Sequence, residues 1–65
     1  MELWVNGSRK TSSAYTVEGL LQEYGMERKL VVVEIDGAII QRDQWAETEL
    51  TAGMRIELVH FVGGG

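Results

Sequence analysis

The sequence predicts an α+β domain in which a mixed β-sheet packs one of its faces against a single main helix. Three observations support this prediction. Short apolar segments stand near both ends of the chain, a helical apolar stripe lies between them, and Asn-Gly and Asp-Gly dipeptides mark two tight turns. With 65 residues, of which 45% are hydrophobic and 25% are charged, the chain has room for one domain only.

The first residues predict a β-hairpin. Residues 2–5 alternate polar and apolar side chains, with Leu3 and Val5 on one side, and Asn6-Gly7 is the strongest short hairpin signal that a sequence carries. The return arm, residues 8–13, is polar on both faces. A strand of this composition is typical of a sheet edge.

The next segment predicts an amphipathic helix. Its apolar residues recur at the helical spacing i, i+3, i+4 and i+7, at Val17, Leu20, Leu21 and Tyr24. We expect Thr16 to be the N-cap, with Tyr15 packing against Leu20 as a hydrophobic staple. We expect Gly25 to end the helix in a left-handed conformation, with Met26 folding back onto the helix.

The second half of the chain predicts three further strands. Residues 30–35 are rich in β-branched side chains, and Asp36-Gly37 marks a tight turn into a short strand. Asp43 is expected to cap a single helical turn, and Trp45 is expected to fill the core beneath this irregular segment. A turn around Gly53 then leads into the last strand, residues 54–62.

The resulting order is strand, strand, helix, strand, short strand, strand, which is the order of the ubiquitin-like β-grasp fold. In that fold the first and last strands lie side by side in the middle of the sheet. We therefore divide the chain into a β-grasp domain, residues 1–60, and a flexible C-terminal tail that ends in Gly-Gly, residues 61–65.

Period-two alternation assigns each strand residue to the helix side or to the solvent side of the sheet. The residues expected on the helix side are Leu3, Val5, Val31, Val33, Ile35, Ile56 and Leu58. The solvent side receives five apolar residues, Trp4, Leu30, Val32, Val59 and Phe61. We predict that these five residues form one contiguous patch that binds a partner, together with the following Val62. The alternative is ordinary scatter, with Phe61 at the sheet edge and Leu30 in a loop.

Composition excludes several classes of protein. Cysteine is absent, so disulfide bonds, thiolate metal sites and a cysteine nucleophile are excluded. The net charge of -4 argues against a nucleic-acid partner and favours a basic protein partner. The sequence begins without a signal-peptide pattern, and no apolar run is long enough to cross a membrane. We therefore expect a soluble cytoplasmic protein that does not bind a membrane.

The residues that a self-sufficient active site needs are missing. His60 is the single histidine and has no obvious triad partner, so we interpret it as a solvated or edge residue. Glu47 and Glu49 flank Thr48 in a short irregular segment, which is typical of a hydrated loop. No metal-ligand spacing is visible. We expect neither an enzyme nor a protein with a bound cofactor.

The sequence ends with "VHFVGGG", and glycines in a row contribute nothing to a helix or a strand. Residues 61–65, fully extended, reach about 17 Å, which is enough to enter another protein's active site. Glycine lets such a tail pass through a narrow channel. We interpret the α-carboxylate of Gly65 as a group that a partner enzyme activates with ATP to an acyl adenylate. The alternative is a frayed end or an expression scar.

The segments "LWVNG", "TVEGLL", "VEIDGAII", "WAET" and "IELVHFVGGG" resemble the ThiS family of thiamin-biosynthesis sulfur carriers over essentially the whole chain. The resemblance implies that an E1-like enzyme of the ThiF type adenylates Gly65 and that a persulfide donor supplies sulfur to form a thiocarboxylate. The sulfur then passes to a thiazole synthase of the ThiG type. Gly64 is the family's penultimate glycine, and Gly63 is an additional one.

Two other interpretations remain open at this point. One is a carrier similar to MoaD, which serves molybdopterin synthesis or another sulfur-insertion pathway; such carriers tend to be longer, with an extended first loop. The other is a ubiquitin-like adaptor that binds through its apolar face and never reacts.

Overall fold

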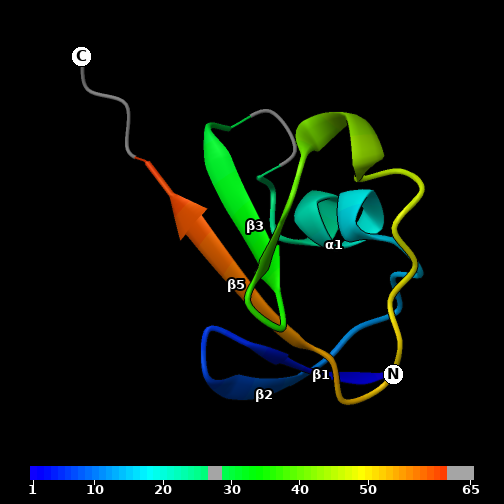
Figure 1. The fold of residues 1–65 in the computed structure, drawn as a ribbon. Helices are drawn as coiled ribbons and strands as arrows, with labels where there is room; N and C mark the ends of the chain where they lie inside the picture. The colour runs from blue at the N-terminus through cyan, green and yellow to red at the C-terminus, as the bar shows by residue number, and fades with distance from the viewer. Residues whose placement is uncertain (27–28, 62–65) are drawn as a thin grey trace.

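The computed structural model describes residues 1–26 and 29–61 of the chain. They form one five-stranded mixed sheet with an α-helix on one face (Figure 1). The elements in chain order are β1 (Glu2–Val5), β2 (Ser8–Thr11), α1 (Val17–Glu23), β3 (Val31–Ile35), β4 (Ala38–Ile40), a 3₁₀ turn (Arg42–Gln44) and β5 (Arg55–His60).

The strand order in the sheet is β2-β1-β5-β3-β4. β1 and β5 are parallel neighbours, with Val5 opposite Ile56, and every other pair of neighbouring strands is antiparallel. The prediction that the first and last strands lie side by side within the sheet is therefore confirmed. The polar strand β2 forms one edge of the sheet, as its composition predicted.

Both predicted hairpin turns are present. Asn6 and Gly7 have φ of 51° and 82°, and Asp36 and Gly37 have φ of 49° and 88°. Two successive residues with positive φ are typical of the type I′ turn, whose twist matches that of the flanking strands. The local dipeptide signal was sufficient to place both turns.

The helix begins and ends as its flanking residues predicted. The Thr16 hydroxyl oxygen accepts a hydrogen bond from the Gly19 N–H at 3.1 Å. At the other end, Gly25 has φ of 68°, and the N–H of Met26 donates to the Leu21 carbonyl at 2.8 Å. These are the contacts of a side-chain N-cap and a Schellman C-terminus.

The predicted hydrophobic staple is wrong, because Tyr15 is 79% exposed. Its carbonyl accepts a hydrogen bond from the Leu50 N–H at 2.8 Å, and the next residue, Thr16, forms an antiparallel bridge with Glu49. This pairing of the chain before the helix with residues 49–50 leaves the Tyr15 ring in solvent.

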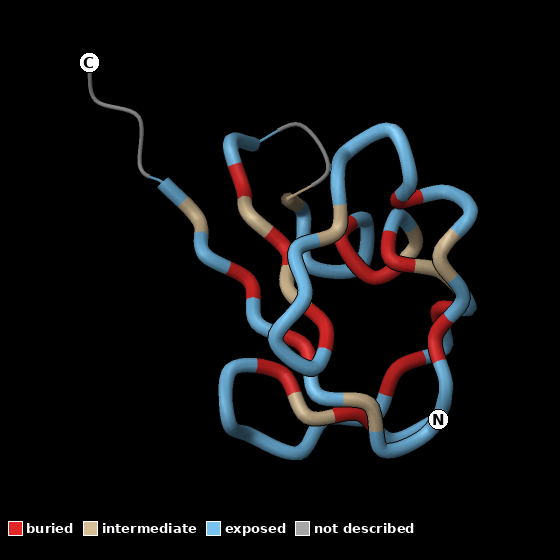
Figure 2. The backbone as a smooth tube through the Cα atoms, viewed as in Figure 1, coloured by how far each residue is buried: buried red, intermediate tan, exposed pale blue. Residues whose placement is uncertain are grey.

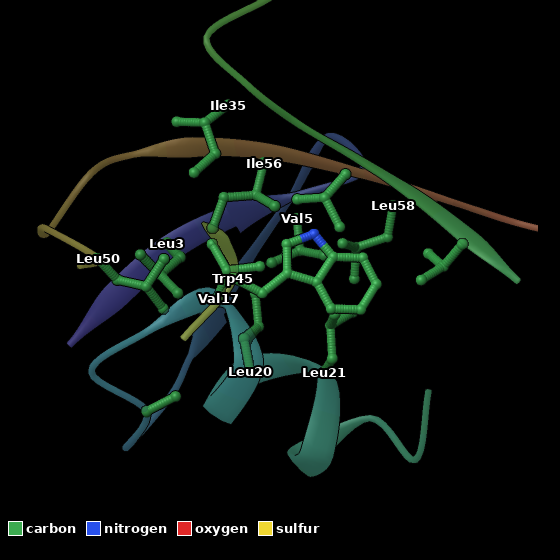
Figure 3. Packing of buried hydrophobic residues seen from close by; sticks show 13 residues of the cluster. Leu3, Val5, Val17, Leu20, Leu21, Ile35, Trp45, Leu50, Ile56 and Leu58 are labelled. Carbon is green, nitrogen blue, oxygen red and sulfur yellow. The ribbon is translucent and has the colours of Figure 1, made fainter. Parts of the chain in front are cut away.

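The core lies between the sheet and α1 (Figures 2 and 3). All seven strand residues predicted to face the helix are buried. Of the helix stripe, Val17, Leu20 and Leu21 are fully buried, whereas Tyr24 lies at the exposed margin. Buried and more exposed residues alternate along β3 and β5, which is the period-two pattern that the sequence predicted.

Trp45 fills the core as predicted, with 4% of its surface exposed. Figure 3 shows its indole between the helix residues and the strand residues, and its Nε1–H donates to the Ile40 carbonyl at 3.1 Å. The predicted capping role of Asp43 is wrong, because this residue lies inside the 3₁₀ turn and Gln41 stands at the N-cap. Arg42 stabilises the segment instead, with its guanidinium 4.5 Å from the Trp45 ring centroid.

Candidate functional site

The outer face of the sheet, which is turned away from α1, carries a group of apolar side chains at the end of β5. Val59 lies opposite Val32, and the Phe61 N–H donates to the Leu30 carbonyl at 3.0 Å. Leu30, Val59 and Phe61 are 67%, 44% and 49% exposed, and Val32 is half-buried. We call these four residues the apolar end. Exposed apolar residues that gather in this way are typical of a protein-binding surface.

Trp4 does not belong to this group. It lies opposite Arg55, which precedes Val59 by four residues, or about 13 Å of strand. The half-buried Trp4 ring is flanked by the guanidinium groups of Arg9 and Arg55, at 5.8 and 5.4 Å from its centroid. The predicted patch of five contiguous residues is therefore wrong in extent: four lie together and Trp4 lies apart.

Charged residues separate the two parts of the outer face. Glu34 and Glu57 lie directly opposite each other on β3 and β5, between the apolar end and Trp4. Like charges in this position destabilise a sheet, so the pair is not explained by stability. Strand alternation in the sequence could have placed both carboxylates on this face, and the two-residue hairpin turn could have placed Arg9 beside Trp4.

The remaining predicted site residues have two different outcomes. Val62, Gly63, Gly64 and Gly65 lie outside the described residues. His60 ends β5 opposite Val31 and is half-buried, and its imidazole makes no hydrogen bond within residues 1–26 and 29–61. His60 thus lies at the end of an interior strand and not on an edge strand of the sheet.

The part of the chain that the structure describes contains no cluster of three side chains from histidine, aspartate and glutamate that could hold a metal ion. It also contains no helix long and apolar enough to span a membrane. Glu47 and Glu49 are exposed in an irregular segment, as predicted.

Comparison with known proteins identifies the family. A family model described as the ThiS family matches residues 5–65. The chain belongs to the ThiS family. Its relatives in this family include the sulfur carrier protein ThiS of Bacillus subtilis (strain 168), which is 46% identical over 50 residues, covering 77% of this chain and 76% of that protein.

Solved ThiS structures have the same fold. The crystal structure of the thiamine biosynthesis protein (ThiS) from Geobacter metallireducens superposes with a TM-score of 0.82 and 30% sequence identity, over 100% of both chains. The ubiquitin-like β-grasp fold predicted from the sequence is confirmed by this match and by the strand order.

The chain also matches part of a larger protein. The thiazole synthase of Paramagnetospirillum magneticum (strain ATCC 700264 / AMB-1) is 38% identical over 66 residues, which are 100% of this chain and 20% of that protein. The thiazole synthase of Magnetococcus marinus (strain ATCC BAA-1437 / JCM 17883 / MC-1) is 36% identical over the same shares. This ThiS-family chain thus spans about a fifth of the length of the two thiazole synthases.

Proposed function

We propose that this chain carries sulfur on Gly65, which is first converted to an acyl adenylate and then to a thiocarboxylate. Membership of the ThiS family makes the chain a sulfur carrier of thiamine biosynthesis and not an enzyme in itself. The family match is the observation that carries the proposal. Residues 63–65 are three glycines, so a carboxylate on Gly65 would stand on residues with little steric bulk.

The proposed chemistry explains why a partner enzyme is needed. A carboxylate becomes an acyl donor when one of its oxygens attacks the α-phosphorus of ATP, which releases pyrophosphate and leaves the acyl adenylate. The sulfur of a persulfide then attacks the acyl carbon and AMP departs. A thiol cleaves the sulfur–sulfur bond of this product and leaves the thiocarboxylate. An E1-like enzyme of the ThiF type performs the first step in the cytoplasm, where ATP is available.

The apolar end is the surface that we assign to the activating enzyme. Leu30, Val59 and Phe61 are exposed at the end of β5, from which residues 62–65 continue the chain. A partner that covers these side chains is therefore close to the start of the tail. Burial of exposed apolar surface supplies binding free energy, while the tail delivers the reacting group. Val62 follows directly in sequence and is assigned to the same contact.

The proposed sulfur acceptor is a thiazole synthase of the ThiG type. In the two thiazole synthases described above, a region similar to this whole chain is joined to the rest of the protein. The presence of both regions in one protein supports the proposal that the carrier and the synthase work together.

Intact-protein mass spectrometry tests the proposal. Incubation of the carrier with ATP, a ThiF-type enzyme and a persulfide donor is expected to replace one oxygen by one sulfur, with fragmentation placing the change at Gly65. A variant without Gly64 and Gly65 serves as the control and is expected to keep its mass. An unchanged mass of the intact carrier, with an enzyme preparation that modifies its own carrier, would contradict the proposal.

A further inference from the structure

Asn6 has a second role besides forming the first hairpin turn. Its side-chain Oδ1 accepts a hydrogen bond from the Leu58 N–H at 2.8 Å, and its Nδ2–H donates to the Leu58 carbonyl at 3.3 Å. These residues are 52 positions apart in the chain. One carboxamide thus makes the two hydrogen bonds that a neighbouring strand residue would otherwise make.

The backbone of β1 ends before it can make these bonds. The Asn6 N–H donates to the Ile56 carbonyl at 2.9 Å, and a φ of 51° at Asn6 then turns the chain toward β2. Because backbone groups alternate in direction along a strand, those of Leu58 point to the same side as those of Ile56. Figure 1 shows β5 continuing past the β1–β2 turn, with β3 on its other side.

Leu58 is the last described residue of β5 whose backbone is hydrogen-bonded on the β1 side of the strand. After it, His60 lies opposite Val31, and the Phe61 N–H donates to the Leu30 carbonyl at 3.0 Å. Within the described residues, the end of β5 is therefore held by β3 on one side and, at Leu58, by Asn6 on the other.

We infer that Asn6 is a positioning residue for the apolar end, because its carboxamide fixes the direction in which the end of β5 leaves the sheet. Loss of the carboxamide frees one side of β5 three residues before Phe61. The apolar end then moves relative to the rest of the sheet. Binding to the activating enzyme must fix it in one position, and this ordering reduces the binding free energy. Once bound, the enzyme itself holds the apolar end, so the KM for the carrier rises while kcat is unchanged.

The chain offers a matched pair of variants. Asn6→Gly keeps a residue that tolerates positive φ and removes both hydrogen bonds to Leu58. Asp36→Gly makes the same change at the equivalent position of the second hairpin turn, where φ is 49° and the side chain makes no hydrogen bond within the described residues. Asn6→Asp keeps the acceptor and removes the donor, so its effect is expected to lie between those of wild type and Asn6→Gly.

Two measurements test the inference. Amide hydrogen exchange at Leu58 and Phe61 is expected to be faster in Asn6→Gly than in Asp36→Gly under conditions where the two variants are equally stable. The KM for the carrier in pyrophosphate release by the activating enzyme, measured with the persulfide donor present, is expected to rise about fivefold in Asn6→Gly, as for the net loss of one hydrogen bond, and to stay at the wild-type value in Asp36→Gly.

The KM measurement depends on the proposed function, whereas the hydrogen-exchange measurement does not. Faster exchange at Leu58 with unchanged exchange at Phe61 and unchanged KM would show that the bonds are merely structural, and would overturn the inference. If wild-type carrier forms no adenylate, the proposed function fails. In that case, exchange at Phe61 alone decides whether Asn6 holds the end of β5.

Discussion

Glu23 joins the last turn of α1 to the segment after β2. Its carboxylate accepts hydrogen bonds from the hydroxyls of Ser12 and Ser13, at 2.6 and 2.7 Å, and from the Ser13 N–H at 3.1 Å. The Ser12 hydroxyl, followed by that of Ser13, holds the pKa of Glu23 below its ordinary value. Ser12 is buried, and its Oγ also accepts from the Ala14 N–H at 3.0 Å. The Glu23 carboxylate thus holds residues 12–13, which follow β2, against the end of α1.

This contact predicts acid-dependent stability. Because the pKa of Glu23 is lower in the folded state, its contribution to the free energy of unfolding is complete above the ordinary glutamate value of about 4.3. The contribution is lost as the pH falls through the lowered value. Urea denaturation is therefore expected to show a smaller loss of stability on acidification in Glu23→Gln than in wild type. Glu18→Gln, on the same helix, is the control. Equal acid sensitivity in wild type and Glu23→Gln would refute the prediction.

The positions of some single residues can be predicted from the sequence, whereas the contacts of others cannot. The core position of Trp45 is predictable, because tryptophan is highly buried on average. The contact of Ser12 with Glu23 was missed, because it depends on how the segment after β2 approaches the helix, and no local spacing specifies that approach. The bonds from Asn6 to Leu58 were missed for the same reason, since they join opposite ends of the chain.

At the scale of the elements, local signals predicted both ends of the helix. Thr16 and Gly25 act through bonds to residues within one turn, so their sequence context contains the necessary information. The predictions for Tyr15 and Asp43 failed for different reasons: another segment pairs with the chain at Tyr15, whereas Asp43 lies inside the 3₁₀ turn, after the N-cap residue Gln41. Tyr15 lies next to a bridge with residues 49–50, and Arg42, rather than Asp43, makes the stabilising contact with the core tryptophan.

The exposed apolar residues at the end of β5 predict that a substitution there weakens binding to the activating enzyme. Phe61→Asp is expected to raise the dissociation constant of the complex with the activating enzyme about tenfold or more, because a charge replaces an apolar contact. The fold is expected to remain intact, since the side chain is 49% exposed. Titration calorimetry measures the affinity, and circular dichroism checks the fold.

Ile39→Asp is the matched control for this prediction. Ile39, on β4, is 60% exposed. It lies opposite Glu34 of β3, on the same face of the sheet as Phe61. Ile39 lies on a different strand from Phe61 and pairs with Glu34, not with a residue of the apolar end. Its substitution is therefore expected to leave the affinity within about twofold of the wild-type value. Equal weakening by both substitutions would assign the contact to the whole face, and a folded Phe61→Asp variant with wild-type affinity would remove the apolar end from the binding site.

On the scale of the whole molecule, the fold class was predictable from sequence because a single helix and five short strands leave few ways to bury their apolar sides. The division of the outer face was not predictable. Alternation assigns Trp4 and Val59 to a face, but it does not set the offset between two parallel strands that are separated by most of the chain. The observed pairing of Trp4 with Arg55 supplies this offset.

The described core is complete without the last residues, which predicts that stability and sulfur transfer can be separated. Deletion of Gly64 and Gly65 is expected to leave the midpoint of urea denaturation unchanged, because every core residue precedes Val59. The same deletion is expected to abolish thiocarboxylate formation. A ubiquitin-like adaptor would keep its function after this deletion, so retained pathway activity in cells that express only the shortened chain would favour the adaptor.

The parallel arrangement of β1 and β5 places Met1 at the opposite end of the sheet from Phe61 (Figure 1). The terminal ammonium of Met1 donates to the Ser12 carbonyl at 2.6 Å, so this end of the chain is anchored beside β2. An affinity tag or a biosensor linker attached ahead of Met1 would therefore stand clear of the apolar end. Immobilised in this orientation, the carrier can be presented to each enzyme of the pathway in turn on the same chip.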